Sequence, residues 1–246
     1  MKHPADKSPS QKTVGATPPF GRLYDVQGKR LMLYRSGDGH PAVVFLPGAG
    51  MVGLDFLNIH EQISPFTTSV IYDRGGTGWS DHIKLPRDAA EVADELRSLL
   101  RVANVCAPYV LVGHSLGGAY ARRFAQLFPD KIAGLLLLEP AVDNFNAHMP
   151  KQTTFEQFRG IVSTLRLLLH YRRAFRVQFE RMFAKWPDTV RKPLTEYHLA
   201  TLRKTFEEWP PSQRTDEGEL MSELRNGEKL PDVPLRRSNI MTSGTF

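Results

Sequence analysis

The chain has 246 residues, of which 41% are hydrophobic, and a formal net charge of +6. This length and composition predict one globular domain with an insertion, and no apolar stretch approaches the length of a membrane span. The first 20 residues lack the apolar segment of a signal peptide, and the single cysteine cannot form an internal disulfide. We therefore expect a cytoplasmic protein without a membrane-spanning segment.

The N-terminal residues 1–20 predict a disordered tail. Met1 to Pro19 contains four prolines and three lysines, and it has too little apolar surface to order itself. A hairpin is expected next, over Gly21 to Tyr34, where two alternating runs flank the turn signal Gln-Gly-Lys.

Two apolar runs predict buried strands that end in glycine-rich loops. Ala42 to Leu46 leads into Pro47 to Gly50, and Val70 to Tyr72 leads into Asp73 to Asp81. Arg87 to Ala103 then shows apolar residues at helical spacing, with acidic residues near its start. Strands that alternate with helical patterns predict a parallel sheet with helices on both faces.

Residues 109–118 carry the most functional information and read Tyr-Val-Leu-Val-Gly-His-Ser-Leu-Gly-Gly. Ser115 stands between Gly113 and Gly117, after a β-branched run and before a helix pattern over Leu116 to Phe128. Gly-x-Ser-x-Gly on a strand–turn–helix is the nucleophile elbow, in which a strained turn points the hydroxyl out of the sheet. Glycines are needed because a β-carbon would block the turn or the close approach of strand and helix.

A fourth apolar run, Leu135 to Leu138, is followed by Glu139-Pro-Ala. The order of motifs from about Gly21 to about Ala141 resembles the α/β-hydrolase superfamily, specifically its serine hydrolases with a helical cap after the sixth strand. The resemblance implies the α/β-hydrolase fold, a mostly parallel sheet with helices on both faces and a cap insertion. In such sheets ligands bind beyond the carboxyl ends of the strands, where these motifs lie.

The resemblance also implies roles for individual residues. Ser115 would be the catalytic nucleophile, and the backbone N–H groups of Leu116 and Ala49 would form the oxyanion hole. Which N–H within Gly48 to Met51 points inward stays open, and the chain has Pro-Gly where the family often has His-Gly. Glu139 is a candidate acid, because some members place the acid after the sixth strand. No metal or cofactor is implied.

Polar residues near these motifs are interpreted differently. We expect His114 to be structural rather than the base, because neighbours on a tight turn project in different directions. Asp73 and Arg74 close a strand, and Asp73 is interpreted as structural rather than as part of the site. Trp79 would either line the pocket or pack.

Residues 144–230 are expected to form the helical cap, between a core at 21–143 and a returning core strand within 231–246. Apolar residues of this region recur near the helical period and either pack the cap or line a substrate channel: Leu165, Leu168, Leu169, Phe175, Phe179, Met182, Phe183 and Trp186. Four prolines are expected to break the region into short helices: Pro187, Pro193, Pro210 and Pro211. Its basic and acidic stretches are interpreted as solvated faces rather than as a nucleic-acid or membrane surface.

The general base is missing from the place that the resemblance implies. The expected order is serine, acid, histidine, and no histidine follows His198 in the sequence. Arg236 and Arg237 also interrupt the apolar run expected of a buried seventh strand. We therefore expect a chain truncated or frame-shifted before its last strands. Its sheet would lack the seventh and eighth strands, or carry a substitute, and would have an incomplete C-terminal edge.

By elimination alone, His60, His148 and His170 are candidate bases, against surface or cap roles for each. Two functions stay open. The first is a serine hydrolase of small carboxylic-ester-type substrates that acts through Ser115 and is impaired by the missing base. The second is a non-catalytic or vestigial hydrolase-fold protein that binds a small apolar ligand, a partner or nothing. Neither implies a nucleic-acid partner, and both leave the oligomeric state open.

Overall fold

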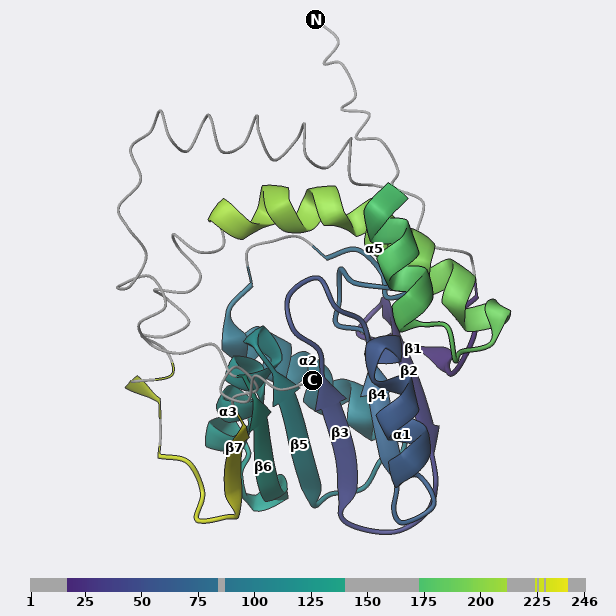
Figure 1. Cartoon of the computed structure of the whole chain (residues 1–246). Coiled ribbons are helices and arrows are strands. Elements are labelled where there is room, and N and C mark those ends of the chain that lie inside the picture. Colours follow the sequence, from purple (N-terminus) through teal and green to yellow (C-terminus); the bar gives the residue numbers. More distant parts are fainter. Residues whose placement is uncertain are drawn as a thin grey trace, which may run out of the picture.

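The computed structural model describes residues 17–83, 87–139, 173–211, 224, 226, 227 and 229–238. Its centre is a seven-stranded sheet with the strand order β1-β2-β4-β3-β5-β6-β7 (Figure 1). Most of the expected N-terminal tail and the first part of the expected cap lie outside the described residues.

Strands β1 (Arg22–Val26) and β2 (Lys29–Ser36) form the predicted hairpin. Gln27 and Gly28 between them have φ values of 56° and 79°, as a two-residue turn of type I′ requires. β2 also pairs antiparallel with β4, so the hairpin forms one edge of the sheet.

The parallel part of the sheet consists of β4 (Ser69–Tyr72), β3 (Ala42–Leu46), β5 (Tyr109–His114) and β6 (Ile132–Leu138). Successive residues of a strand point to opposite faces, so Val44 and Leu111 enter one buried cluster while Phe45 and Val112 enter another. Both faces are therefore apolar and covered, which confirms the predicted α/β-hydrolase architecture.

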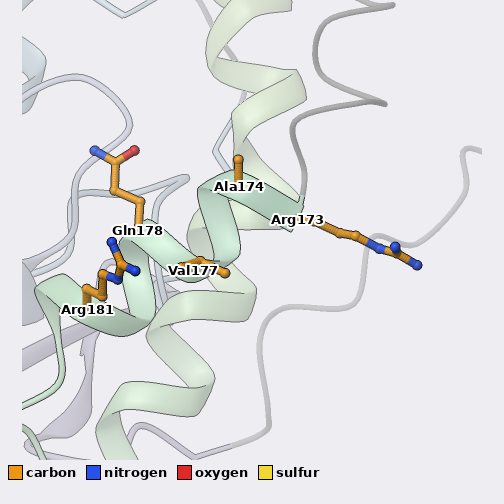
Figure 2. Close-up of a pocket in the computed structure, with 5 residues that line it drawn as sticks. All are labelled: Arg173, Ala174, Val177, Gln178 and Arg181. Carbon is orange, nitrogen blue, oxygen red and sulfur yellow. The ribbon is translucent and has the colours of Figure 1, made fainter.

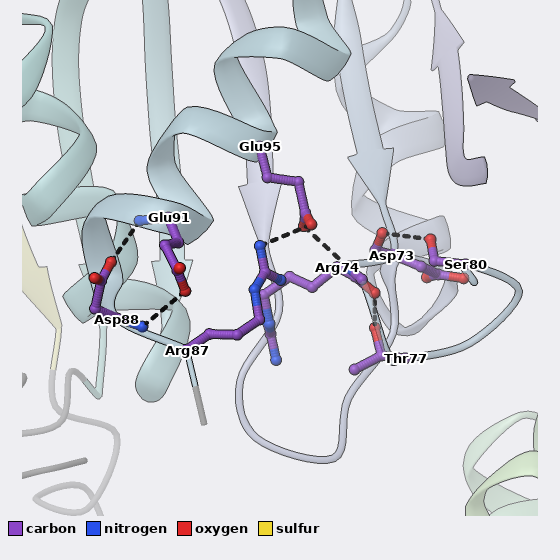
Figure 3. Close-up of polar contacts among 9 residues, drawn as sticks. Asp73, Arg74, Thr77, Ser80, Arg87, Asp88, Glu91 and Glu95 are labelled. Carbon is purple, nitrogen blue, oxygen red and sulfur yellow. Dashed lines mark hydrogen bonds and ion pairs between the residues drawn. The ribbon is translucent and has the colours of Figure 1, made fainter. Parts of the chain in front are cut away.

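Helices cover both faces of the sheet. Helices α2 (Ala89–Val102) and α3 (Leu116–Leu127) pack on one face, while η1 (Gly53–Phe56) and α1 (Leu57–Ile63) pack on the other. The short η2 (Pro129–Lys131) joins α3 to β6. Helix α2 begins where predicted, because Asp88 and Glu91 form a reciprocal capping box (Figure 3).

The described part of the expected cap contains a helix at residues 173–182 and the long helix α5 (Asp188–Pro211). Both lie beyond the carboxyl ends of the parallel strands (Figure 1). The buried side chains of Phe183, Val190 and Leu194 join the same apolar cluster as Phe45 of the sheet. No helix within the described ranges is long and apolar enough to cross a membrane.

Pro193 does not break the cap into shorter helices, which corrects the expectation for that residue. It lies inside α5, between the buried residues Val190 and Leu194. A proline in a helix removes one backbone hydrogen bond and costs about 3 kcal/mol. The burial of its two neighbours offsets that cost, which a proline count in the sequence does not reveal.

A strand occupies the seventh position of the sheet, so of the two alternatives expected there, an absent strand or a substitute, the first is wrong. β7 (Leu235–Ser238) runs parallel to β6, with Leu235 opposite Leu135 and Ser238 opposite Leu138. The side chain of Arg236 is exposed, because β7 stands last in the strand order. An arginine would be unfavourable in a central strand that is buried on both faces. It is compatible with this last strand, because only backbone groups form the hydrogen bonds to β6 and the side chain reaches solvent.

Candidate active site

Ser115 lies in the sharp turn between β5 and α3. Its φ of 49° and ψ of −119° form a backbone conformation that residues with a β-carbon rarely adopt. A β-carbon on Gly113 would lie 2.6 Å from the oxygen of Gly117, and one on Gly117 would overlap the carbonyl of Leu46. The turn has the geometry of a nucleophile elbow, with Ser115 half-buried at the carboxyl end of β5.

Backbone hydrogen bonds hold the elbow in place. The Ser115 N–H donates to the Leu138 carbonyl at 3.0 Å, and the Gly118 N–H donates to the Ser115 carbonyl at 2.9 Å. Leu116 is the first residue of α3, and the first N–H groups of a helix have no acceptor within that helix. These N–H groups carry the positive end of the helix dipole, which suits an anionic oxygen beside Ser115.

Residues 47–51, here named the oxyanion loop, follow β3 and pass directly beside the elbow. A β-carbon on Gly48 would lie 2.9 Å from Nδ1 of His114, the residue before Ser115. Gly50 has a φ of 70°, and the Met51 N–H donates to the Gly48 carbonyl at 3.4 Å. The structure thus places this loop against the elbow, and the donor role of the Ala49 N–H stays a prediction.

Arg74, at the end of β4, is only 6% exposed and reaches the oxyanion loop. Its Nη1 donates to the Pro47 carbonyl, and its Nη2 donates to the Gly48 carbonyl at 2.8 Å. The guanidinium carbon lies 5.4 Å from the centre of the Tyr120 ring. Sequence reasoning missed this contact, because no motif links two loops that follow different strands.

Asp73 is fully buried and structural, as predicted. Its carboxylate accepts the Gly53 N–H at 2.8 Å and the Trp79 N–H at 2.9 Å, and its carbonyl accepts the Ser80 hydroxyl at 2.7 Å (Figure 3). Burial raises the pKa of Asp73 to about 7, although the N–H groups of Trp79 and Gly53 favour the ionised form. These bonds fix the loop from which Arg74 projects.

Glu139, the candidate acid, follows β6 and lies near the elbow. Its Oε2 atom is 3.8 Å from Nε2 of His114, and both side chains are partly exposed. Nδ1 of His114 is buried and has no hydrogen-bond partner. The structure therefore brings Glu139 beside the residue that precedes Ser115, and the structural role expected of His114 stays a prediction.

The candidate base His60 is engaged elsewhere. It is buried in α1, where Nδ1 shares a hydrogen bond of 2.9 Å with the Ser69 hydroxyl and the ring packs against Tyr34. His148 and His170 lie outside the described residues. Within the described ranges, no histidine ring is hydrogen-bonded to the Ser115 hydroxyl.

His198 of α5 forms a contact that sequence reasoning did not find. Its Nε2 atom lies 2.8 Å from Oδ1 of Asp55 in η1, and both side chains are nearly buried. Asp55 also accepts the Val52 N–H at 2.9 Å, immediately after the oxyanion loop. The one signal in the sequence is the helical period, because His198 lies four residues after the buried Leu194 and so on the same face of the helix.

A second contact between α5 and the core lies beside the first. The hydroxyl of Tyr197 accepts the Gly78 N–H at 3.1 Å, and its ring stacks on Trp79 with centroids 6.5 Å apart. Trp79 is 4% exposed, so it packs under the cap rather than forming an open surface. Its packing role is one of the two that the sequence left open.

A cavity with a volume of about 570 Å³ lies away from these residues. Its lining comes from the helix at residues 173–182, and the side chains project from that helix in several directions (Figure 2). Neither the elbow nor the oxyanion loop contributes to it, so it is not the candidate active site.

The model of the alpha/beta hydrolase family matches residues 43–234, which is most of the chain. The chain belongs to this family. The hydrolase is 28% identical over 121 residues to the uncharacterized protein YbdG of Bacillus subtilis, covering 48% of this chain and 37% of that protein. An uncharacterized Schizosaccharomyces pombe protein is 37% identical over 82 residues, covering 33% and 15%. The hydrolase thus spans well under half the length of these relatives.

Solved structures resemble the hydrolase over more of its length. A mutant of the Vigna radiata epoxide hydrolase gives a TM-score of 0.59 at 15% identity, covering 89% of this chain and 79% of that one. The N-acyl homoserine lactone degrading enzyme Est816 gives 0.55 at 17% identity, covering 88% and 91%. At such identities the likeness shows the fold alone.

Proposed function

We propose that this hydrolase cleaves carboxylic-ester-type substrates through a covalent intermediate on Ser115. The observation that carries the proposal is the strained turn that presents Ser115 between the N-terminus of α3 and the oxyanion loop. The proposal assigns the Ser115 hydroxyl as the nucleophile and the N–H groups of Leu116 and Ala49 as the oxyanion donors that acyl transfer requires. Est816, which shares the fold, is described as an N-acyl homoserine lactone degrading enzyme, and a lactone is a cyclic ester.

In the proposed reaction, the Ser115 hydroxyl oxygen attacks the acyl carbon and its proton passes to a base. The tetrahedral oxyanion accepts hydrogen bonds from the N–H groups of Ala49 and Leu116. Its collapse breaks the bond to the alkoxide, which leaves as the alcohol with the proton from the base, and an acyl-Ser115 ester remains. Water then loses a proton to the base and attacks the acyl carbon, and the carboxylic acid leaves as that proton returns to the Ser115 oxygen. Glu139 is proposed as the acid that would orient a base, because it stands at the carboxyl end of β6 beside the elbow.

Covalent labelling with a fluorophosphonate tests the nucleophile. We expect a single adduct on the peptide that contains Ser115 after long incubation, and none in Ser115→Ala. Ser98→Ala, in the buried face of α2, is the matched control and should label like the unmodified chain. A folded chain that stays unlabelled and turns over no p-nitrophenyl ester would refute the proposal.

A second candidate is a non-catalytic binding protein on the same fold. Two histidine contacts favour this candidate. The ring of His60 is hydrogen-bonded to Ser69 and the ring of His198 to Asp55, and neither ring is hydrogen-bonded to Ser115. This candidate predicts a folded chain without Ser115 labelling. The cytoplasmic location and the cap boundaries 144–230 remain predictions alongside it.

A further inference from the structure

We propose that Arg74 is a positioning residue that orients the oxyanion loop and strengthens its N–H donor. This inference rests on the proposed function, and it gives a role to a buried charge that the reaction itself does not use. Arg74 is 6% exposed, and its guanidinium donates hydrogen bonds to the consecutive carbonyls of Pro47 and Gly48.

The geometry of the peptide bond links this contact to the direction of the Ala49 N–H group. In a trans peptide the carbonyl and the following N–H point in opposite directions. The Gly48 carbonyl points toward Arg74, so the Ala49 N–H of the same peptide points away from Arg74. The Pro47 carbonyl also points toward Arg74, so the Gly48 N–H points away from Arg74 as well. Arg74 therefore orients two consecutive peptides of the loop, whose Gly48 lies against His114 and thus against the elbow.

The positive charge of Arg74 also makes the Ala49 N–H a stronger hydrogen-bond donor. A hydrogen bond from a cation to a carbonyl polarises the peptide and makes its N–H a better donor, as in other hydrogen-bonded chains. Burial keeps water from screening that effect. Arg74 therefore prepares the Ala49 N–H for an anionic oxygen without touching the substrate.

The surroundings of Arg74 support a fixed rather than a mobile clamp. Its own carbonyl accepts the Thr77 hydroxyl at 2.9 Å, and the next N–H, that of Gly75, donates to Glu95 at 3.0 Å (Figure 3). Glu95 is in turn bonded to Arg87 at 2.8 Å. Among the described residues, Arg74 forms no salt bridge, and its guanidinium donates to two carbonyls and lies over the Tyr120 ring. Burying a cation without a paired carboxylate is costly for stability, which favours a role in the site.

Three variants separate positioning from packing. Arg74→Met keeps most of the side-chain volume and removes the charge, and Arg74→Lys restores a charge without the two-pronged geometry. Arg35→Met is the control, because it removes a guanidinium that also donates to a backbone carbonyl, that of Asn104, outside the oxyanion loop and its supporting contacts. We expect Arg74→Met to slow phosphonylation of Ser115 by about 10- to 100-fold. Arg74→Lys should recover part of that loss, and Arg35→Met should label like the unmodified chain.

Amide NMR supplies a readout that does not depend on activity. In Arg74→Met the ¹³C carbonyl signal of Gly48 and the ¹⁵N signal of Ala49 should move more than those of residues outside the two loops, and Arg35→Met should leave them in place. Unmoved Gly48 and Ala49 signals would overturn the proposal, whether or not the unmodified chain is labelled. With a labelled chain, equal labelling rates in Arg74→Met and Arg35→Met would also overturn it.

The two failures stay distinguishable. If the unmodified chain is never labelled, the proposed function is refuted. The NMR signals of Gly48 and Ala49 then test by themselves whether Arg74 orients the oxyanion loop. If Arg74→Met does not fold, the Gly48 and Ala49 signals of Arg74→Lys take its place, and their identity with the unmodified chain overturns the proposal.

Discussion

Two buried titratable side chains give the protein opposite responses to pH. Burial lowers the pKa of His60 to about 4, and it raises the pKa of Asp73 to about 7. As pH falls from about 6.5 to 4, the unfolded state binds a proton at His60 that the folded state refuses, so stability is lost. As pH rises from about 4 to 7, the folded state keeps a proton on Asp73 that the unfolded state releases, so stability is again lost.

Between pH 5 and 6.5 these two effects oppose each other, which predicts a nearly flat stability curve for the unmodified chain. His60→Gln should become more stable toward pH 5, and Asp73→Asn should become less stable, each with a slope of at most about 1.4 kcal/mol per pH unit. Urea unfolding at several pH values measures both slopes. Parallel curves for all three proteins would contradict this assignment.

The histidine contacts also predict how much the Ser115 hydroxyl contributes to turnover. Loss of the base from a serine triad costs about 10⁶ in turnover, while oxyanion donors and binding retain about 10³ over water. We expect Ser115→Ala to change p-nitrophenyl acetate hydrolysis by less than about tenfold. A hundredfold loss with the fold intact would show that the chain supplies a base, and His148→Ala and His170→Ala would locate it.

At the scale of elements, the contact between α5 and η1 depends on one nearly buried pair. His198→Ala and Asp55→Ala should each lower the free energy of unfolding by about 1–3 kcal/mol. Asp55→Ala should cost more, because Asp55 also accepts the Val52 N–H. The double-mutant cycle should give a coupling of about 1 kcal/mol or more.

The exposed pair Arg176–Glu196 is the matched control for this cycle. Both of its side chains reach solvent, and exposed ion pairs contribute about 0.2–1 kcal/mol. A coupling for Asp55–His198 no larger than for the control pair would show that the cap is held by apolar packing alone.

The elements whose signals are local could be predicted from the sequence. The elbow at Ser115 and the hairpin turn at Gln27 follow from residues that are neighbours in the chain. Pro193 inside α5 and Arg236 in β7 could not be predicted, because tertiary burial and an edge position decide them. The clamp of Arg74 on Gly48 joins loops that come together only once the sheet has formed.

At the scale of the whole molecule, the strand order and the two buried clusters agree with the predicted architecture. The period-two alternation along Val44 and Phe45 is enough to place apolar side chains on both faces. The cap boundaries at 144 and 230 stay a prediction. Within them, helix α5 shares one continuous apolar cluster with the sheet, through side chains that include Val190 and Leu194.

This apolar cluster affects how fast α5 can move away from the core as well as where α5 lies. Lifting α5 from the core would expose Phe183, Val190 and Leu194 to water, at roughly 1.5–3 kcal/mol for each fully buried side chain. Such an opening is rare in an unliganded molecule and belongs to the microsecond-to-millisecond range of lid motions. If the proposed ester cleavage takes place beneath α5, entry of substrate and escape of product would each depend on this opening.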